Sequence, residues 1–324
     1  MAEVIYLDQN HWVTMARARV APEKIQGAEE RRAAEELWEL AAKKAVRLPL
    51  SSAHLVETAH AGTKERRHDL ARAMLEAYDG WHMLSPLVVR LHEFAGAFSG
   101  RKLTAEHVFT NAPQSPFSNY PLEIDSPDAA APTGTATLGM TDVVWRATWA
   151  SLLLEESLPQ DEQEAINTVV AGWADAASQL AQGLREHPAE RDMRLVAAAY
   201  MLNDLKMELA QAGQLAGHHS PAETLTFLQP EKVVEFFSRL PFTGRVLEVL
   251  QARLRNASDV WVNNDLNDLY FLACAAGYAD HVVAEKKTGT FLQSADKALG
   301  APRASVHLNL RSLVGALKSS TAGI

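Results

Sequence analysis

The sequence of 324 residues contains almost no cysteine: Cys274 is the only one. A single thiol excludes a disulfide framework within the chain and any zinc site built on several cysteines. This usage is typical of proteins from a reducing compartment, and we expect a cytoplasmic protein.

Long apolar runs are missing as well. No stretch of 18 apolar residues occurs, which predicts that no helix crosses a membrane, and the opening residues MAEVIYLDQNHW do not form a signal peptide. The sequence also lacks a glycine-rich phosphate loop, a Gly-x-Ser-x-Gly elbow and an H-E-x-x-H zinc motif. Without cysteine partners or that spacing, we interpret the remaining histidine candidates as surface or core residues: His54, His60, His218 and His219.

Charge is distributed unevenly along the chain. The net charge is −9, yet residues 1–110 carry 15 basic and 15 acidic residues, and residues 251–324 carry 8 basic and 6 acidic residues. Residues 111–250 hold the excess, with 19 acidic against 8 basic residues. The two ends of the chain are therefore compatible with a phosphate-bearing partner, whereas the acidic middle could contact a protein.

The two ends of the chain alternate between strand and helix patterns, and the middle does not. Short apolar or β-branched runs predict five strands: Val4–Leu7, Val46–Leu48, Asp259–Val262, His281–Ala284 and Ser305–Leu308. Residues 110–141 contain five prolines and predict a long loop, and residues 142–257 have helical spacing almost throughout. We therefore predict one α/β domain formed by residues 1–80 and 258–324, interrupted by a helical insertion at residues 81–257.

Acidic residues recur where strands end and helices begin. Asp8 closes the first strand, and Glu57 lies in a helix that Ser51 or Ser52 would cap. Asp265 and Asp268 fall three residues apart in the first turn of a helix, which places both on one face. Glu285 closes a later strand. The carboxyl ends of parallel strands form the usual ligand-binding rim of an α/β sheet.

Helix capping is the alternative interpretation of these acids. An Asp at a helix N-terminus satisfies free N–H groups and stabilises the helix by about 0.5–2 kcal/mol. Capping accounts for one Asp, but several carboxylates on one face repel each other unless a cation or a proton relieves them. Oxygen ligands of this kind suit Mg²⁺ or Mn²⁺, which activates a bound water. His11, next to Asn10, is a candidate general base, a role that such metal chemistry does not require.

Taken together in chain order, these segments resemble a PIN-domain nuclease: Asp8 with Asn10, SSAHLVE ending at Glu57, NDLND ending at Asp268, and VVAE ending at Glu285. The resemblance implies a three-layer α/β/α fold with a central parallel sheet and Mg²⁺- or Mn²⁺-dependent ribonuclease activity. It implies Asp8 and Asp268 as the most direct metal ligands, Glu57 and Glu285 as further ligands, Asp265 as a supporting acid and Asn10 as a supporting polar residue. The family often has Asp where this chain has Glu285.

Two functional hypotheses follow from the sequence. The first is a metal-dependent endoribonuclease that hydrolyses phosphodiester bonds, with RNA a better candidate than DNA and with Lys286 and Lys287 as substrate-binding residues. The second is a catalytically inactive PIN-like module that binds or regulates a protein partner through its acidic helical insertion. The first hypothesis places the catalytic residues at Asp8, Glu57, Asp265 and Asp268.

Overall fold

The computed structural model describes most of the chain. The described residues are 2–59, 61–111, 144, 147–154, 160–186, 192–218, 224, 232–256, 258–262, 265–300 and 302–321. Nearly all of the predicted proline-rich loop at 110–141 lies outside them, as do His60, His219 and Asn264.

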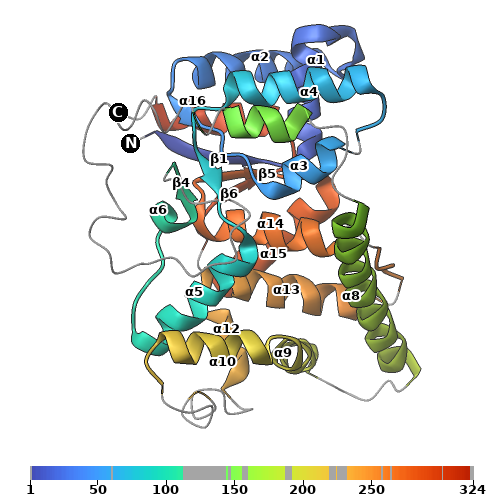
Figure 1. Cartoon of the computed structure of the whole chain (residues 1–324), viewed down its shortest axis with the longest axis vertical. Coiled ribbons are helices and arrows are strands. Elements are labelled where there is room, and N and C mark those ends of the chain that lie inside the picture. Colours follow the sequence, from blue (N-terminus) through green and yellow to red (C-terminus); the bar gives the residue numbers. More distant parts are fainter. Residues whose placement is uncertain are drawn as a thin grey trace.

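A four-stranded parallel sheet joins the two ends of the chain (Figure 1). Its order is β2-β1-β5-β6, and its strands are β1 (Glu3–Leu7), β2 (Val46–Arg47), β5 (His281–Val283) and β6 (Ser305–His307). Ile5 pairs with His281, and His281 pairs in turn with Ser305. The structure thus confirms an α/β fold with a parallel sheet.

Alternation along β1 supplies both faces of the sheet with apolar side chains. Ile5 and Leu7 are fully buried in one hydrophobic cluster together with Val283, while Val4 and Tyr6 belong to a second cluster on the opposite face. The first cluster is completed mainly by four helices: α1 (Gln9–Val20), α2 (Ala28–Ala42), α4 (Lys64–Ala77) and α16 (Leu310–Thr321). These helices lie together on one side of the sheet in Figure 1.

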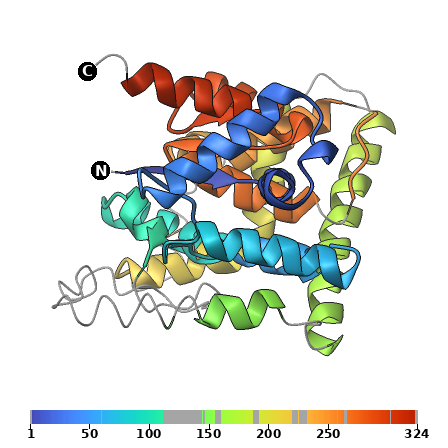
Figure 2. The same ribbon diagram turned by 90° about the horizontal axis from the view of Figure 1, so that it is seen from above.

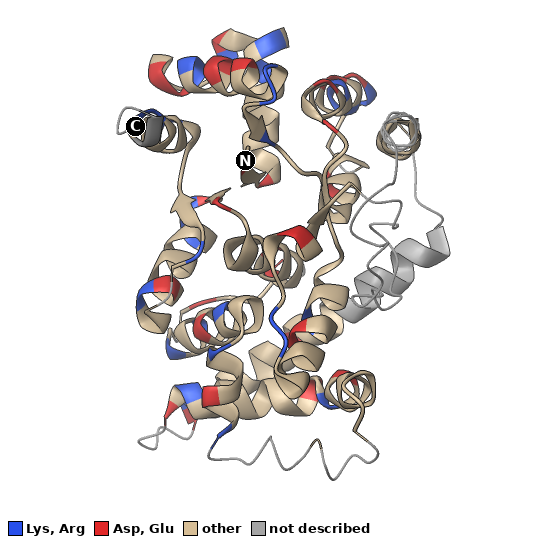
Figure 3. Ribbon diagram, turned by 90° about the vertical axis from the view of Figure 1, so that its left-hand side faces the viewer, with Lys and Arg blue, Asp and Glu red and all other residues tan. Residues whose placement is uncertain are grey.

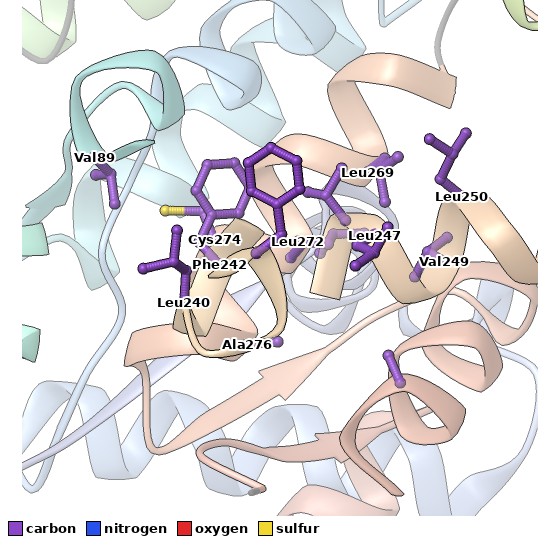
Figure 4. Packing of buried hydrophobic residues seen from close by; sticks show 14 of the residues in the cluster. Val89, Leu240, Phe242, Leu247, Val249, Leu250, Leu269, Leu272, Cys274 and Ala276 are labelled. Atoms are coloured by element: carbon purple, nitrogen blue, oxygen red, sulfur yellow. The ribbon is translucent and has the colours of Figure 1, made fainter. Parts of the chain in front are cut away.

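The second cluster is the larger part of the core. It includes four helices: α5 (Pro86–Ser99), α13 (Pro241–Arg255), α14 (Asp265–Tyr278) and α15 (Lys286–Leu299). Figure 4 shows Phe242 and Leu247 of α13 packed beside Leu269 and Leu272 of α14. Gly277 permits this close packing, since a Cβ there would come within 2.9 Å of the Pro241 carbonyl carbon.

Shorter or more peripheral elements complete the described chain. They are η1 (Pro22–Lys24), α3 (Ser52–Ala59), β3 (His82–Met83), α6 (Ala105–Val108), β4 (Phe109–Thr110), α8 (Gln160–Glu186), α9 (Met193–Asp204), α10 (Lys206–Leu215) and α12 (Val233–Ser238). The helix α8 stands on the side of the molecule toward which β1 runs, in both Figure 1 and Figure 2. No described helix has the length and apolarity needed to cross a bilayer.

The predicted boundary between the α/β part and the insertion falls within connected structure. Leu50 forms a parallel β-bridge with His82, and its backbone exchanges hydrogen bonds with Trp81 and Met83. Residues just after 80 therefore continue beside the sheet. At the other end, α13 packs against α14 and α15 as well as against α9 and α12. The helical region and the α/β region share one continuous core.

One element prediction was wrong. Asp259–Val262 is not a strand, because the segment is turned toward Arg253, which binds the Asp259 carboxylate and the Val260 carbonyl oxygen. After β5 the chain passes through Glu285 directly into α15, which begins at Lys286. Glu285 therefore lies at the start of a helix, at the edge of the sheet.

Glu93 of α5 stabilises the buried start of α13. Its carboxylate accepts hydrogen bonds from Phe242 N at 2.6 Å, Thr243 N at 3.0 Å, Thr243 Oγ1 at 2.7 Å and Tyr278 Oη at 2.6 Å. The residue before α13, Leu240, has no side chain that could cap these N–H groups. One carboxylate from a different helix therefore replaces the missing cap and joins α5, α13 and α14.

Glu93→Gln should lower the unfolding free energy by about 2–3 kcal/mol. The NH2 group of the glutamine would replace one carboxylate oxygen, and this new donor would face the N–H and O–H donors that now bind Glu93. Urea unfolding followed by circular dichroism measures this change. Thr243→Val is the control; it removes one hydroxyl donor and should cost only about 1 kcal/mol. Equal stability of Glu93→Gln and the wild type would contradict the capping role.

Candidate carboxylate site

Asp8 lies where β1 ends and α1 begins. Its backbone N–H donates to the carbonyl oxygen of Val283 at 2.9 Å, which continues the pairing of β1 with β5. One carboxylate oxygen accepts Gln9 N at 2.8 Å, and the other accepts Glu285 N at 3.2 Å. Asp8 thus caps α1 and also joins the ends of two strands that are 277 residues apart in sequence.

Glu285 follows β5 and precedes α15 at the same edge of the sheet. Its side chain is exposed, and Asn10 donates from Nδ2 to its Oε1 atom. Because Asn10 is in the first turn of α1, this bond orients the Glu285 carboxylate toward the Asp8 side of the edge. The pairing of Asn10 with a carboxylate agrees with its predicted supporting role and does not test a role in metal binding.

Glu57 is positioned by its neighbours on α3. Ser51 N donates to His54 Nδ1 at 3.0 Å, so the proton of the neutral ring lies on Nε2, which donates to the Leu7 carbonyl oxygen at 2.8 Å. Gln9 Nε2 donates to Thr58 Oγ1 at 3.0 Å. His54 and Thr58, which lie on either side of Glu57 in sequence, thus bind Leu7 and Gln9, the two neighbours of Asp8.

Asp268 lies in the first turn of α14, facing the same group of acids. Neither Asp268 nor Glu57 forms a hydrogen bond or an ion pair with any residue that the structure describes, although both are largely withdrawn from solvent. A half-buried carboxylate without a donor is unusual, because burial disfavours the charged form unless a cation or a hydrogen-bond donor compensates.

The four acids influence one another electrostatically. Burial and, to a smaller extent, the negative charges of Asp8, Asp268 and Glu285 together raise the pKa of Glu57 to about 8. Burial and the repulsion from Asp8 and Glu285 together raise the pKa of Asp268 to about 7. Burial also raises the pKa of Asp8, but its two backbone N–H donors and the nearby His11 oppose that rise. The acids predicted as metal ligands thus form one interacting group.

Asp265 is in a different position from these four. Its Oδ2 atom accepts Arg253 Nη2 at 2.8 Å and Val262 N at 2.7 Å. Asp265 therefore binds the segment just before α14, and its charge is balanced by Arg253. It acts on the acid group through repulsion, contributing to the raised pKa of Asp268.

The two predicted substrate-binding lysines differ from each other. Both lie exposed in the first turn of α15, next to Glu285. Lys287 Nζ forms an ion pair with Asp259 Oδ1 at 3.0 Å. Lys286 forms no ion pair with a described residue.

The donor chemistry suits a hard divalent cation, but the side chains do not form a finished metal site. In the part of the chain that the structure describes, no three Asp, Glu, His or Cys side chains are arranged to hold an ion. The possible metal ligands at the sheet edge are nevertheless all carboxylate oxygens, from Asp8, Glu57, Asp268 and Glu285. The Glu57 and Asp268 carboxylates have no hydrogen bond or ion pair with a described residue. A divalent cation would relieve the repulsion that raises their pKa values.

The positioning residues were missed in the sequence. His54 was expected to be a surface or core residue and is fully buried, but its bond to the Leu7 carbonyl cannot be read from spacing. Gln9 and Thr58 bind each other across 49 residues of sequence, which no local motif indicates. Arg253 lies closer to its partners Asp259 and Asp265 but belongs to no recognisable motif with them. His218 accepts or donates a hydrogen bond with Thr224 and packs against Phe98, away from the acids.

Comparisons of the chain with protein-family models, with curated proteins and with solved structures found no match.

Stability in chelator should depend on pH through Asp268. The pKa of Asp268 in the folded protein, about 7, lies above its ordinary value. The contribution of Asp268 to the free energy of unfolding is therefore complete in acid and is lost as the pH rises from about 4 to about 8. Above that pH it changes no further. Asp268→Asn, which mimics the neutral acid, should therefore add about 1–2 kcal/mol at about pH 8.5 and much less at about pH 5, after allowance for solvent screening.

Urea unfolding at the two pH values measures this difference. The exposed Asp175 on α8 provides the control, and Asp175→Asn should change stability equally at both pH values. A gain from Asp268→Asn that is equal at both pH values, or a loss at the higher one, would show that Asp268 is not under repulsion and would favour its interpretation as a capping residue.

Proposed function

We propose that the protein is a metal-dependent nuclease that hydrolyses phosphodiester bonds, with RNA as the expected substrate. One observation carries the proposal: four acids from the two ends of the chain lie at the carboxyl edge of a parallel sheet, and two of them are half-buried without any described partner. Such a group is suited to binding a cation and, through the cation, a phosphate.

The fold proposed for this activity is a three-layer PIN-like α/β/α domain. Its support is the parallel sheet with α1, α2, α4 and α16 on one face and α13, α14 and α15 on the other. The resemblance in chain order of the four acid segments is the second support. The described helices α8, α9, α10 and α12 are then an addition to that domain: α9 and α12 pack on α13, α8 packs on α14 and α10 packs on α5.

Each acid has a defined role in the proposal. Bound Mg²⁺ or Mn²⁺ would supply an activated water and stabilise charge on the phosphate. Asp8 offers the most rigid carboxylate, because its two oxygens are fixed by Gln9 N and Glu285 N. Asp268 and Glu57 offer oxygens free of described donors, and Glu57 is held close to Asp8 through His54 and Thr58. Asn10 holds the longer Glu285 side chain at the edge.

Substrate contacts would come from the rim of this edge. Lys286 lies at the exposed start of α15, next to Glu285, where a cation and helix N–H groups can both meet a phosphate. Elsewhere, acidic and basic residues alternate along the outer helices in Figure 3. A broad basic surface is therefore not the basis of the proposal; the expected contacts are local.

The alternative is a PIN-like module that binds a partner without cutting. It is favoured by the absence, among the described residues, of three acid, histidine or cysteine side chains arranged to hold an ion. The excess of acidic residues in 111–250 would suit a protein partner of opposite charge. The two functions differ in one measurable property, the dependence of RNA cleavage on a divalent cation.

Purified protein incubated with single-stranded RNA and Mn²⁺ should cleave the RNA, and chelator should abolish cleavage. Asp8→Asn and Asp268→Asn should each reduce the cleavage rate by a factor on the order of 100 or more, because each removes a charged ligand. Gel analysis of end-labelled RNA measures the rate, with single-stranded DNA run in parallel.

Asp175→Asn is again the matched control and should cleave at the wild-type rate. Full activity in both site variants would overturn the proposal. Absence of cleavage by the wild type, together with no Mn²⁺-dependent rise in melting temperature, would favour the non-cutting module instead.

A further inference from the structure

Arg253, at the end of α13, is a buried guanidinium at the meeting point of several segments next to the acid group. Its side chain is 4% exposed. Nη2 donates to Asp265 Oδ2 at 2.8 Å and to the Val260 carbonyl oxygen at 3.0 Å, and Nε donates to Asp259. The guanidinium carbon lies 3.7 Å from the centre of the Trp261 ring.

Through these partners Arg253 is connected to two helices that carry acids of the site. Asp265 is the first residue of α14, one turn before Asp268. Asp259 forms its second ion pair with Lys287 of α15, at 3.0 Å, and Lys287 is two residues after Glu285. One guanidinium therefore constrains the starts of both helices, at Asp265 directly and at Lys287 through Asp259.

A small pocket lies between these helix starts. It is lined by Arg253, Asp265, Asp268 and Lys287 together with Leu269 and Phe291, and it has room for one water molecule at most. Asp268 thus lines the same pocket as Arg253, Asp265 and Lys287. A shift of the α14 start relative to α15 would move Asp268 and Glu285 relative to each other.

We propose that Arg253 is a positioning residue of the carboxylate site, through which the helical region sets the separation of Asp268 and Glu285. Resting on the proposed nuclease function, this inference adds a residue outside the PIN-like segments to the machinery. Trp261 extends the connection, because its ring contacts Trp173 of α8 edge-on with ring centres 5.2 Å apart. The helical addition thereby reaches the site through α13 and α8.

Arginine is required at this position for a geometric reason. Its planar guanidinium binds two carboxylates and a carbonyl from one side chain while its face stacks on Trp261. Lysine keeps the charge but has a compact ammonium group, which cannot hold the same set of partners. Arg253→Lys therefore tests positioning without removing the buried charge.

The chain provides a matched control on the same helix. Arg245 is also buried, at 1% exposure, and its ion pair with Asp296 joins the same two helices, α13 and α15. It lies two turns before Arg253, or about 12 Å along the helix axis. Arg245→Lys should lower stability to a comparable extent while leaving the acid group in place.

Hydrogen exchange followed by mass spectrometry tests the inference without any need for activity. In metal-free Arg253→Lys, amides in 265–268 and 285–289 should exchange roughly tenfold faster than in the wild type and in Arg245→Lys. In the cleavage assay, Arg253→Lys should lower kcat by a factor on the order of 100, with KM nearly unchanged, because a misplacement of about 1 Å has that effect.

Asp259→Asn is the second variant, for use if Arg253→Lys does not fold. It weakens the link from Arg253 through Asp259 to Lys287, leaves the Arg253–Asp265 pair in place, and should speed exchange mainly in 285–289. Unchanged exchange in both segments, or an equal change in Arg245→Lys, would overturn the positioning role of Arg253. A wild type without cleavage activity, with the exchange pattern as expected, would instead reject the nuclease function and leave Arg253 as the residue that sets the acid geometry.

Discussion

The repulsion among four carboxylates at one edge of a small sheet is the constraint on which the arrangement of this protein depends. The four acids come from four separate segments: Asp8, Glu57, Asp268 and Glu285. The negative charges of the other three raise the pKa of Glu57, and burial raises the pKa values of Asp8 and Asp268. Holding such a group together requires rigid attachment of every acid. The pairing of β1 with β5 provides that attachment for Asp8 and Glu285.

The other attachments come from neutral or cationic side chains. His54 and Gln9 hold α3 against the end of β1, and Arg253 holds the start of α14. Burial lowers the pKa of His54 to about 4, so this ring stays neutral and can donate to the Leu7 carbonyl throughout the physiological range. The repulsion among the four carboxylates is thus offset by the hydrogen bonds of His54, Gln9 and Arg253, which hold the elements that carry the acids.

The sequence was sufficient to predict the parts of the fold that depend on local pattern. The apolar runs around Ile5 and Val282 predicted parallel strands, and acids directly after them were expected to share an edge; the structure confirms the pairing of those strands and the contact of Asp8 with the Glu285 backbone. Local pattern failed at Asp259–Val262, where β-branched residues suggested a strand. Arg253, six residues before Asp259, binds the Asp259 carboxylate and the Val260 carbonyl oxygen, so the Val260 carbonyl pairs with a side chain and not with a neighbouring strand.

What could not be predicted is contact between distant residues. The spacing placed Asp265 on one helix face with Asp268, yet its ion pair with Arg253 depends on how α13 packs on α14. Similarly, Glu93 as the cap of α13 joins residues about 150 positions apart. Such bonds are consequences of packing, and no periodicity in either segment indicates them.

Calorimetric titration of the protein with Mn²⁺ at about pH 7, in two buffers of different ionisation enthalpy, tests the central claim most directly. Because the pKa of Glu57 is raised to about 8 and that of Asp268 to about 7, the metal-free protein holds protons on these carboxyls that a bound cation must displace. The account predicts saturable binding with release of about one proton, and weaker release in Asp268→Asn. Absence of binding, or binding without proton release, would contradict it.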